Sequence, residues 1–181
     1  MMDIIARIVD IFERRGAESY LGEQVTMSQH MLQAASLAES ECADDELVVG
    51  ALLHDVGHYA DEFSEYSPSD TLDKRHDLVG ARLLEGHFSG RVVDGVRLHV
   101  LAKRYLCTVE ADYLAKLSAA SVHTLGLQGG PMSADEVADF EARVGAHDAL
   151  RIRRWDEAAK KVGVLTPDLA HFIPAIRRVR A

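Results

Sequence analysis

The stretch Leu52-Leu53-His54-Asp55-Val56-Gly57-His58 decides how the rest of this sequence is interpreted. It ends an apolar run that we expect to form a buried central helix over residues 45–56. Three side chains that can bind a metal ion, those of His54, Asp55 and His58, stand at its carboxyl end. Polar groups buried without partners cost free energy, so these three require hydrogen bonds or a bound cation. A histidine–aspartate pair alone is common, so a metal site needs further ligands elsewhere in the chain.

Apolar residues recur at helical spacing along most of the chain, and no stretch alternates as a strand would. The first expected helix closes at Gly16, and the second begins after Thr26 or Ser28 and ends near Glu41. Residues 60–73 are rich in turn formers and indicate a surface loop. We predict an all-α bundle of seven to nine helices in a single domain over residues 1–181. The remaining helices are expected at about 45–56, 74–86, 89–104, 109–123, from Ser133 onward, 146–162 and 167–180.

Composition excludes several classes of protein. The formal net charge is −9, which argues against a nucleic-acid binder because such proteins carry a basic surface. The longest apolar run, residues 47–53, is far too short to span a bilayer. The amino terminus shows amphipathic spacing and an acidic Asp3, unlike a signal peptide. Cys42 and Cys107 have no framework spacing, so we expect a cytoplasmic protein that binds neither nucleic acid nor membrane.

Further metal-capable side chains lie on four other predicted helices. A single histidine on an apolar face is usually a hydrogen-bonded core residue. An upstream histidine, a buried histidine–aspartate pair and a downstream aspartate together make a four-part site. The additional candidates are His30, His76, His99 and Asp156.

The order His30, His54-Asp55, Asp156 resembles the HD-domain superfamily over roughly residues 20–160. That resemblance implies an all-helical HD-domain bundle, and most HD proteins are metal-dependent phosphohydrolases. His76 and His99 match the subset of the superfamily with a binuclear site. Four imidazoles and two carboxylates suit iron or another transition metal better than Mg²⁺, which prefers oxygen ligands.

Four downstream segments carry a closer resemblance: HVLAKRYL (99–106), YLAKLS (113–118), QGGPM (128–132) and IRRWDE (152–157). In order and spacing they are similar to the HD-domain mixed-valent diiron phosphonate oxygenases. Upstream, YLGE (20–23) stands where that family keeps a tyrosine and a glutamate on a mobile lid. The resemblance implies two iron ions, Fe(II) and Fe(III), O₂ as co-substrate, and cleavage of the C–P bond of a small organophosphonate.

The resemblance also implies roles for individual residues. The first iron would be held by His30, His54, Asp55 and Asp156, with Asp55 bridging to a second iron held by His76 and His99. Lys103 lies one helical turn from His99, and Arg153 lies three residues before Asp156, so both can reach an anion beside the metals. His58 is expected to donate to bound substrate and, with Lys103, to be catalytic. Further substrate contacts are expected from Tyr20, Glu23, Ser121 and Gln128, with Glu23 facing an ammonium group.

The loop after His58 favours one substrate over another. It carries Tyr59, Asp61, Glu62, Phe63, Glu65 and Tyr66, an acidic and aromatic run suited to a trimethylammonium group. We therefore favour (R)-1-hydroxy-2-(trimethylammonio)ethylphosphonate, giving glycine betaine and phosphate. The other candidate is 2-amino-1-hydroxyethylphosphonate, giving glycine and phosphate.

Three alternatives use the same ligands differently. An HD-type metal-dependent phosphohydrolase would attack a phosphate ester with metal-bound hydroxide and need no O₂. A regulatory module would sense a nucleotide or a metal without turnover. An oxygenase similar to inositol oxygenase would share the ligand set but would not need Lys103 and Arg153 for a dianion.

Overall fold

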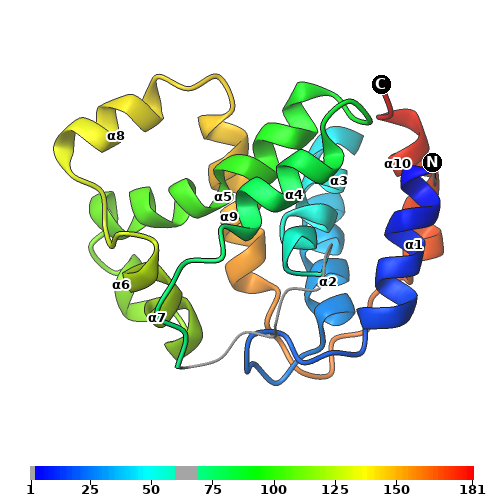
Figure 1. Ribbon diagram of the computed structural model, residues 1–181, viewed down its shortest axis with the longest axis horizontal. Coiled ribbons are helices and arrows are strands. Elements are labelled where there is room, and N and C mark those ends of the chain that lie inside the picture. The colour runs from blue at the N-terminus through cyan, green and yellow to red at the C-terminus, as the bar shows by residue number, and fades with distance from the viewer. Residues whose placement is uncertain (1–2, 60–68) are drawn as a thin grey trace.

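The computed structural model describes residues 3–59 and 69–181, and the regular elements of this part of the chain are helices (Figure 1). Its only β-type pairings are two isolated bridges, so the all-α expectation is confirmed for the described residues. The elements are α1 (Ile4–Arg15), α2 (Met27–Ser40), α3 (Asp45–Leu53), the 3₁₀ turn η1 (Val56–His58), α4 (His76–Leu84), α5 (Gly90–Val109), α6 (Tyr113–Lys116), α7 (Ala119–Leu127), α8 (Ala134–Glu141), α9 (Ala146–Ala158) and α10 (Leu169–Arg178).

The described ranges hold ten α-helices, one more than the upper expectation of nine. The helix expected over 109–123 is wrong, because α5 continues to Val109 and the chain then forms two separate helices. Leu117 adopts an extended conformation that ends α6. The Ser118 side chain then accepts a hydrogen bond from the Ser121 backbone and starts α7. The expected helix over 45–56 ends at Leu53, because Asp55 leaves the helical conformation (φ −103°, ψ 9°).

Four helices, α2, α3, α5 and α9, form the body that we call the bundle. Helix α3 is apolar on every side, and its residues 47–53 are all buried between α2, α5, α9 and α10. The helices approach closely because Gly50 of α3 and Gly95 of α5 both face the δ-methyl of Ile152 on α9. A Cβ at Gly95 would lie 2.6 Å from that methyl. The bundle is therefore a tightly packed frame for the residues at the end of α3.

A smaller unit, which we call the lobe, consists of α6, α7 and α8. It lies at one end of the molecule beside α5, and α1 and α10 lie at the other end near both termini (Figure 1). Within the lobe, helix α8 and the preceding Met132 share a second, small core with α5 and α9. Its buried members are Leu98, Ala102, Met132, Phe140, Ala146 and Ala149.

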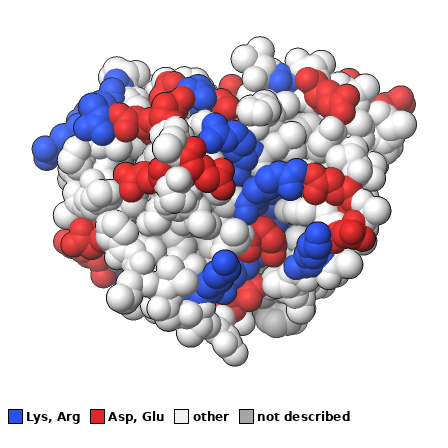
Figure 2. Space-filling view, turned by 180° about the vertical axis from the view of Figure 1, so that it is seen from behind, with Lys and Arg blue, Asp and Glu red and all other residues white. Residues whose placement is uncertain are grey.

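The surface carries both signs of charge. On the face shown in Figure 2, acidic and basic side chains are interspersed. Within the described ranges, every helix is too short or too polar to cross a bilayer.

Candidate active site

The end of α3 places two side chains in the centre of the bundle. His54 is fully buried and Asp55 is 2% exposed. The Nδ1 atom of His54 lies 2.7 Å from the Ala51 carbonyl, which fixes the ring and turns Nε2 toward Asp55. The chain then bends at Gly57, where a Cβ would lie 1.9 Å from the carbonyl oxygen of His76. Glycine therefore allows the first residue of α4 to meet the η1 turn backbone to backbone.

Six buried side chains converge there in two overlapping groups. His30, His54, Asp55 and Asp156 form the first group, and Asp55, His76 and His99 form the second. Within each group, one candidate ligand atom per residue lies within 4.8 Å of the others. Asp55 belongs to both because its two oxygens face opposite ways. Its Oδ2 lies 3.6 Å and 3.4 Å from Nε2 of His30 and His54, and its Oδ1 lies 3.3 Å from Nε2 of His76 and of His99.

The imidazoles are oriented as metal ligands are. The Nδ1 atoms of His30, His54 and His99 face the carbonyls of Ala159, Ala51 and Val96 at 2.7–3.0 Å. If these Nδ1 atoms donate, each Nε2 lone pair faces the cluster.

The spacing of the facing nitrogens also fits a bound ion. Nε2 of His30 lies 3.1 Å from Nε2 of His54, and the corresponding atoms of His76 and His99 are 3.0 Å apart. Two lone pairs face each other at such a distance only with a proton or a metal ion between them. Two nitrogens bound to one ion at about 2.1 Å and near right angles lie about 3 Å apart. Asp156 Oδ1 is buried without a hydrogen-bond partner among the described residues. The residues present therefore fit two transition-metal ions that share Asp55.

The buried imidazoles and carboxylates of the cluster shift each other's pKa values. Burial opposes a charged His54, but Asp55 and Asp156 outweigh it and raise the pKa of His54 to about 10. Burial favours a neutral Asp55, but His54 and its neighbours hold the pKa of this carboxyl well below its usual range. A metal ion held by Nε2 of His54 would compete with a proton for the same nitrogen.

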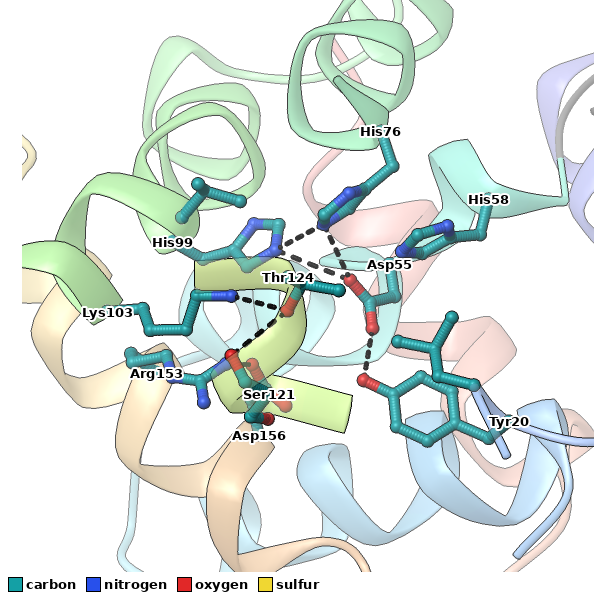
Figure 3. Close-up of a pocket in the computed structure, with 12 residues that line it drawn as sticks. Tyr20, Asp55, His58, His76, His99, Lys103, Ser121, Thr124, Arg153 and Asp156 are labelled. Carbon is teal, nitrogen blue, oxygen red and sulfur yellow. Dashed lines mark hydrogen bonds and ion pairs between the residues drawn. The ribbon is translucent and has the colours of Figure 1, made fainter. Parts of the chain in front are cut away.

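A small cavity opens directly onto the second group (Figure 3). Metal-capable and cationic side chains line it together. Its wall consists of Tyr20, Leu21, Asp55, His58, His76, His99, Val100, Lys103, Ser121, Thr124, Arg153 and Asp156.

Lys103 reaches this cavity from α5. It is 4% exposed, and its Nζ donates to Thr124 Oγ1 at 3.0 Å. Burial and the nearby Arg153 lower the pKa of Lys103 to about 7. Since no carboxylate forms an ion pair with Lys103 among the described residues, its ammonium is available to an anion in the cavity.

Arg153 reaches the same cavity from α9 and is also 4% exposed. Its Nε donates to the Tyr113 hydroxyl at 2.9 Å, and its two terminal nitrogens donate to Asp156 and Glu157. Burial opposes the charge, but Asp156 and Glu157 raise the pKa of Arg153, so it stays a cation. Arg153 therefore both fixes a candidate metal ligand and faces the cavity.

The other expected substrate contacts are divided between the cavity and its surroundings. The Tyr20 hydroxyl donates to Asp55 Oδ2 at 2.7 Å, and its ring stacks on His30. His58 stacks on His76, and its buried Nε2 has no hydrogen-bond partner in the described ranges. Gln128 lines a neighbouring small cavity with His58. Glu23 follows Tyr20 in a tight turn and lines neither cavity.

Part of the loop used to choose a substrate lies outside the described residues. These are the acidic and aromatic positions Asp61, Glu62, Phe63, Glu65 and Tyr66. Tyr59, which we assigned to the same run, is 5% exposed and packs in the main core.

Sequence reasoning missed three side chains at this site. Thr124 accepts from Lys103, Tyr113 accepts from Arg153, and Lys160 donates to Ser121 Oγ at 2.9 Å. Thr124 lies one turn after Ser121 on α7, so helical spacing alone would have found it. Lys160 follows the end of α9, where no periodicity places its side chain.

Comparison with known proteins agrees with this geometry. The family model for the HD domain matches residues 27–133, a span that contains five of the six candidate ligands. The chain belongs to the HD-domain family. This HD-domain chain is 49% identical over 98% of its length to [1-hydroxy-2-(trimethylamino)ethyl]phosphonate dioxygenase (glycine-betaine-forming) of Leisingera caerulea, covering 90% of that protein. It is 43% identical over 92% of its length to hydroxymethylphosphonate dioxygenase of Gimesia maris, covering 84%. The expected relationship to phosphonate oxygenases is confirmed.

Proposed function

We propose that this chain is a diiron oxygenase that cleaves the C–P bond of 1-hydroxy-2-(trimethylammonio)ethylphosphonate. Substrate and O₂ give glycine betaine and phosphate. The C–P bond breaks, carbon and phosphorus each gain one oxygen, and O₂ is reduced by four electrons. The observation that carries the proposal is a single cavity lined both by the second candidate metal group and by Lys103, Ser121 and Arg153.

The donor set indicates which residues would hold the metals. His30, His54, Asp55 and Asp156 would hold one ion, and Asp55, His76 and His99 the other. The second group offers three protein ligands, which leaves positions for other molecules. When bound, a redox-active metal pair supplies the activation of O₂ and the coordination of substrate oxygens. Imidazole and carboxylate ligands suit iron, and O₂ chemistry favours it over redox-inactive zinc.

The chain itself would bind and orient the substrate. The ammonium of Lys103 and the guanidinium of Arg153 would bind the phosphonate dianion, since both are desolvated and cationic. Ser121 would add a neutral donor. Tyr20 would cover the cluster and, with Leu21, exclude water from the reacting carbon. His58, whose pKa burial holds well below the usual value, would act as a neutral ring beside the substrate.

The trimethylammonium end distinguishes this substrate from hydroxymethylphosphonate. The 49% identical relative acts on the trimethylamino compound, according to its name. Glu23 offers a buried carboxylate oxygen without a hydrogen-bond partner in the described part of the chain. It lies in the turn that holds Tyr20 over the cluster, so a small rearrangement of this turn would bring a negative charge to the cation.

Phosphate release in air and under nitrogen tests the proposal. Fe(II)-loaded protein is offered the trimethylammonio, amino and unsubstituted hydroxy-phosphonates in parallel. We expect O₂-dependent release, fastest with the trimethylammonio compound. Faster phosphate release from either of the other two compounds would show that the trimethylammonio compound is not the preferred substrate. Release from a phosphate ester under nitrogen, with none from any phosphonate, would identify the HD-type phosphohydrolase instead.

A further inference from the structure

The segment that follows α9 is held in place on both sides. The Ala159 carbonyl lies 3.0 Å from Nδ1 of His30. The backbone N–H and C=O of Lys161 pair with the side-chain amide of Gln33 at 3.2 Å and 2.9 Å. Lys160 stands between these two anchors, so its backbone position is fixed by α2.

The Lys160 side chain turns toward the cavity wall. Its Nζ donates to Ser121 Oγ at 2.9 Å and to Glu157 Oε2 at 3.1 Å. The side chain is 10% exposed. Glu157 Oε2 also accepts from the Arg153 guanidinium. One carboxylate oxygen therefore joins Lys160 to a cation of the candidate anion site.

The available protons determine which atom donates in the hydrogen bond between Lys160 and Ser121. An ammonium has donors and no acceptor, so Ser121 Oγ must accept. A serine hydroxyl has one proton, and no acceptor receives it among the residues that the structure describes. Because Ser121 lines the cavity, that proton is free to be donated into it.

Thr124, one turn further along α7, provides the contrast. Its hydroxyl accepts from Lys103 at 3.0 Å and donates to the Ser121 carbonyl at 3.2 Å. The Thr124 proton is thus used within its own helix. Of the two neighbouring hydroxyls, Ser121 alone keeps a proton for a bound anion.

We propose that Lys160 is a positioning residue that orients the Ser121 hydroxyl as a donor to the phosphonate. Glu157 accepts hydrogen bonds from both Lys160 and Arg153. The Ser121 hydroxyl and the Arg153 guanidinium would therefore contact the same anion. This inference rests on the proposed function for its substrate. The arrangement itself recognises any phosphonate or phosphate dianion, which permits a test that needs no turnover.

The test compares two adjacent lysines by the same substitution. Lys160→Met removes the donor, and Lys161→Met is the matched control because the Lys161 side chain is exposed. Calorimetric binding of inorganic phosphate to metal-loaded protein is measured together with KM and kcat for the phosphonate. We expect Lys160→Met to raise both the phosphate Kd and KM about tenfold, the effect of losing a hydrogen bond to a charged group. The kcat value and metal content should change little, and Lys160→Arg should restore most of the affinity.

A double variant distinguishes a positioning role of Lys160 from a direct effect of its positive charge on the anion. In Ser121→Ala protein, Lys160→Met should raise the phosphate Kd less than about threefold, because the hydroxyl is already absent. An equal effect of Lys160→Met with and without Ser121 would overturn the inference, as would equal behaviour of Lys160→Met and Lys161→Met. Wild-type protein that fails to bind phosphate would also overturn it. Phosphate binding without O₂-dependent turnover would reject the proposed function alone.

Discussion

The bundle and the lobe contribute different things to one cavity. The bundle, together with His54 and Asp55 directly after α3, supplies five of the six candidate metal ligands, all of them 2% exposed or less, and α4 supplies His76. The lobe supplies Ser121 and Thr124 from helices of four to nine residues, with Leu114 and Val122 at least 40% exposed. Metal ligands need fixed geometry, and substrate contacts tolerate a less tightly packed support. We therefore expect substitutions in the lobe to alter the cavity while the metal cluster stays intact.

The strongest test of this division removes the shared carboxylate from the bundle. We expect Asp55→Ala to lose the second metal ion and to lower kcat/KM at least about 1,000-fold, because its two oxygens face both halves of the cluster. Metal content by mass spectrometry and phosphate release measure the two effects. Asp45→Ala at the start of α3 is the control, since that carboxylate pairs with Arg178 on α10. Two ions retained per Asp55→Ala chain would contradict the bridging role.

The next test addresses the anion site without touching a metal ligand. We expect Lys103→Met to raise KM about 100-fold with metal content unchanged, because a buried cation facing the dianion is lost. Lys116→Met is the matched control, since Lys116 is exposed on α6. An unchanged KM would remove Lys103 from the substrate site, and a loss of metal would show that the anion site and the metal cluster are not separable within the bundle.

The pH dependence of kcat/KM tests the charge of Lys103 without a substitution. With a pKa near 7 in the free protein, the Lys103 ammonium is charged below pH 7 and becomes neutral above it. We expect kcat/KM to fall about tenfold between pH 7 and pH 8 to 8.5 as that charge is lost. The pH–rate profile should lose this descending limb in Lys103→Met protein. A limb that persists in the variant would assign the titration to another group.

The smallest expected effect comes from loosening the lobe. Phe140 is 1% exposed in the small core, and Phe140→Leu should lower the free energy of unfolding by about 1 kcal/mol. Phe172→Leu in the main core is the control, with Phe172 fully buried. We expect a roughly threefold higher KM and faster amide exchange in α8 for Phe140→Leu only. Equal KM changes in both variants would mean that substrate binding does not depend on the lobe separately.

The sequence anticipated the bundle better than the lobe. Helix α3 is apolar on every side, and the only environment that satisfies such a helix is a core, so its burial was predictable. The lobe helices are short, and the serine at 118 starts one of them inside what periodicity indicates is a continuous helix. A local capping interaction therefore outweighed the apolar pattern there.

Three candidate ligands could be predicted because His54 and Asp55 end an apolar run and His30 lies among apolar positions of α2, where a polar group needs a partner. The full set followed from the resemblance to the HD-domain family. The polar network around them could not be predicted. Lys160 meets Ser121 across 39 residues of sequence, and Arg153 meets Tyr113 across 40. Such contacts depend on how α7 and α9 pack, and a single sequence does not record that packing.

Gly57 has a consequence for how the two halves of the cluster are held apart. Because the chain at this residue touches the His76 carbonyl directly, the separation between the halves is set by main chain resting on main chain. Side-chain substitutions around the cluster can change what binds there, but they leave this backbone contact between residues 57 and 76 unchanged. A methyl group at position 57 would push the His76 backbone away. It would misplace His76 while leaving all six ligands in the sequence.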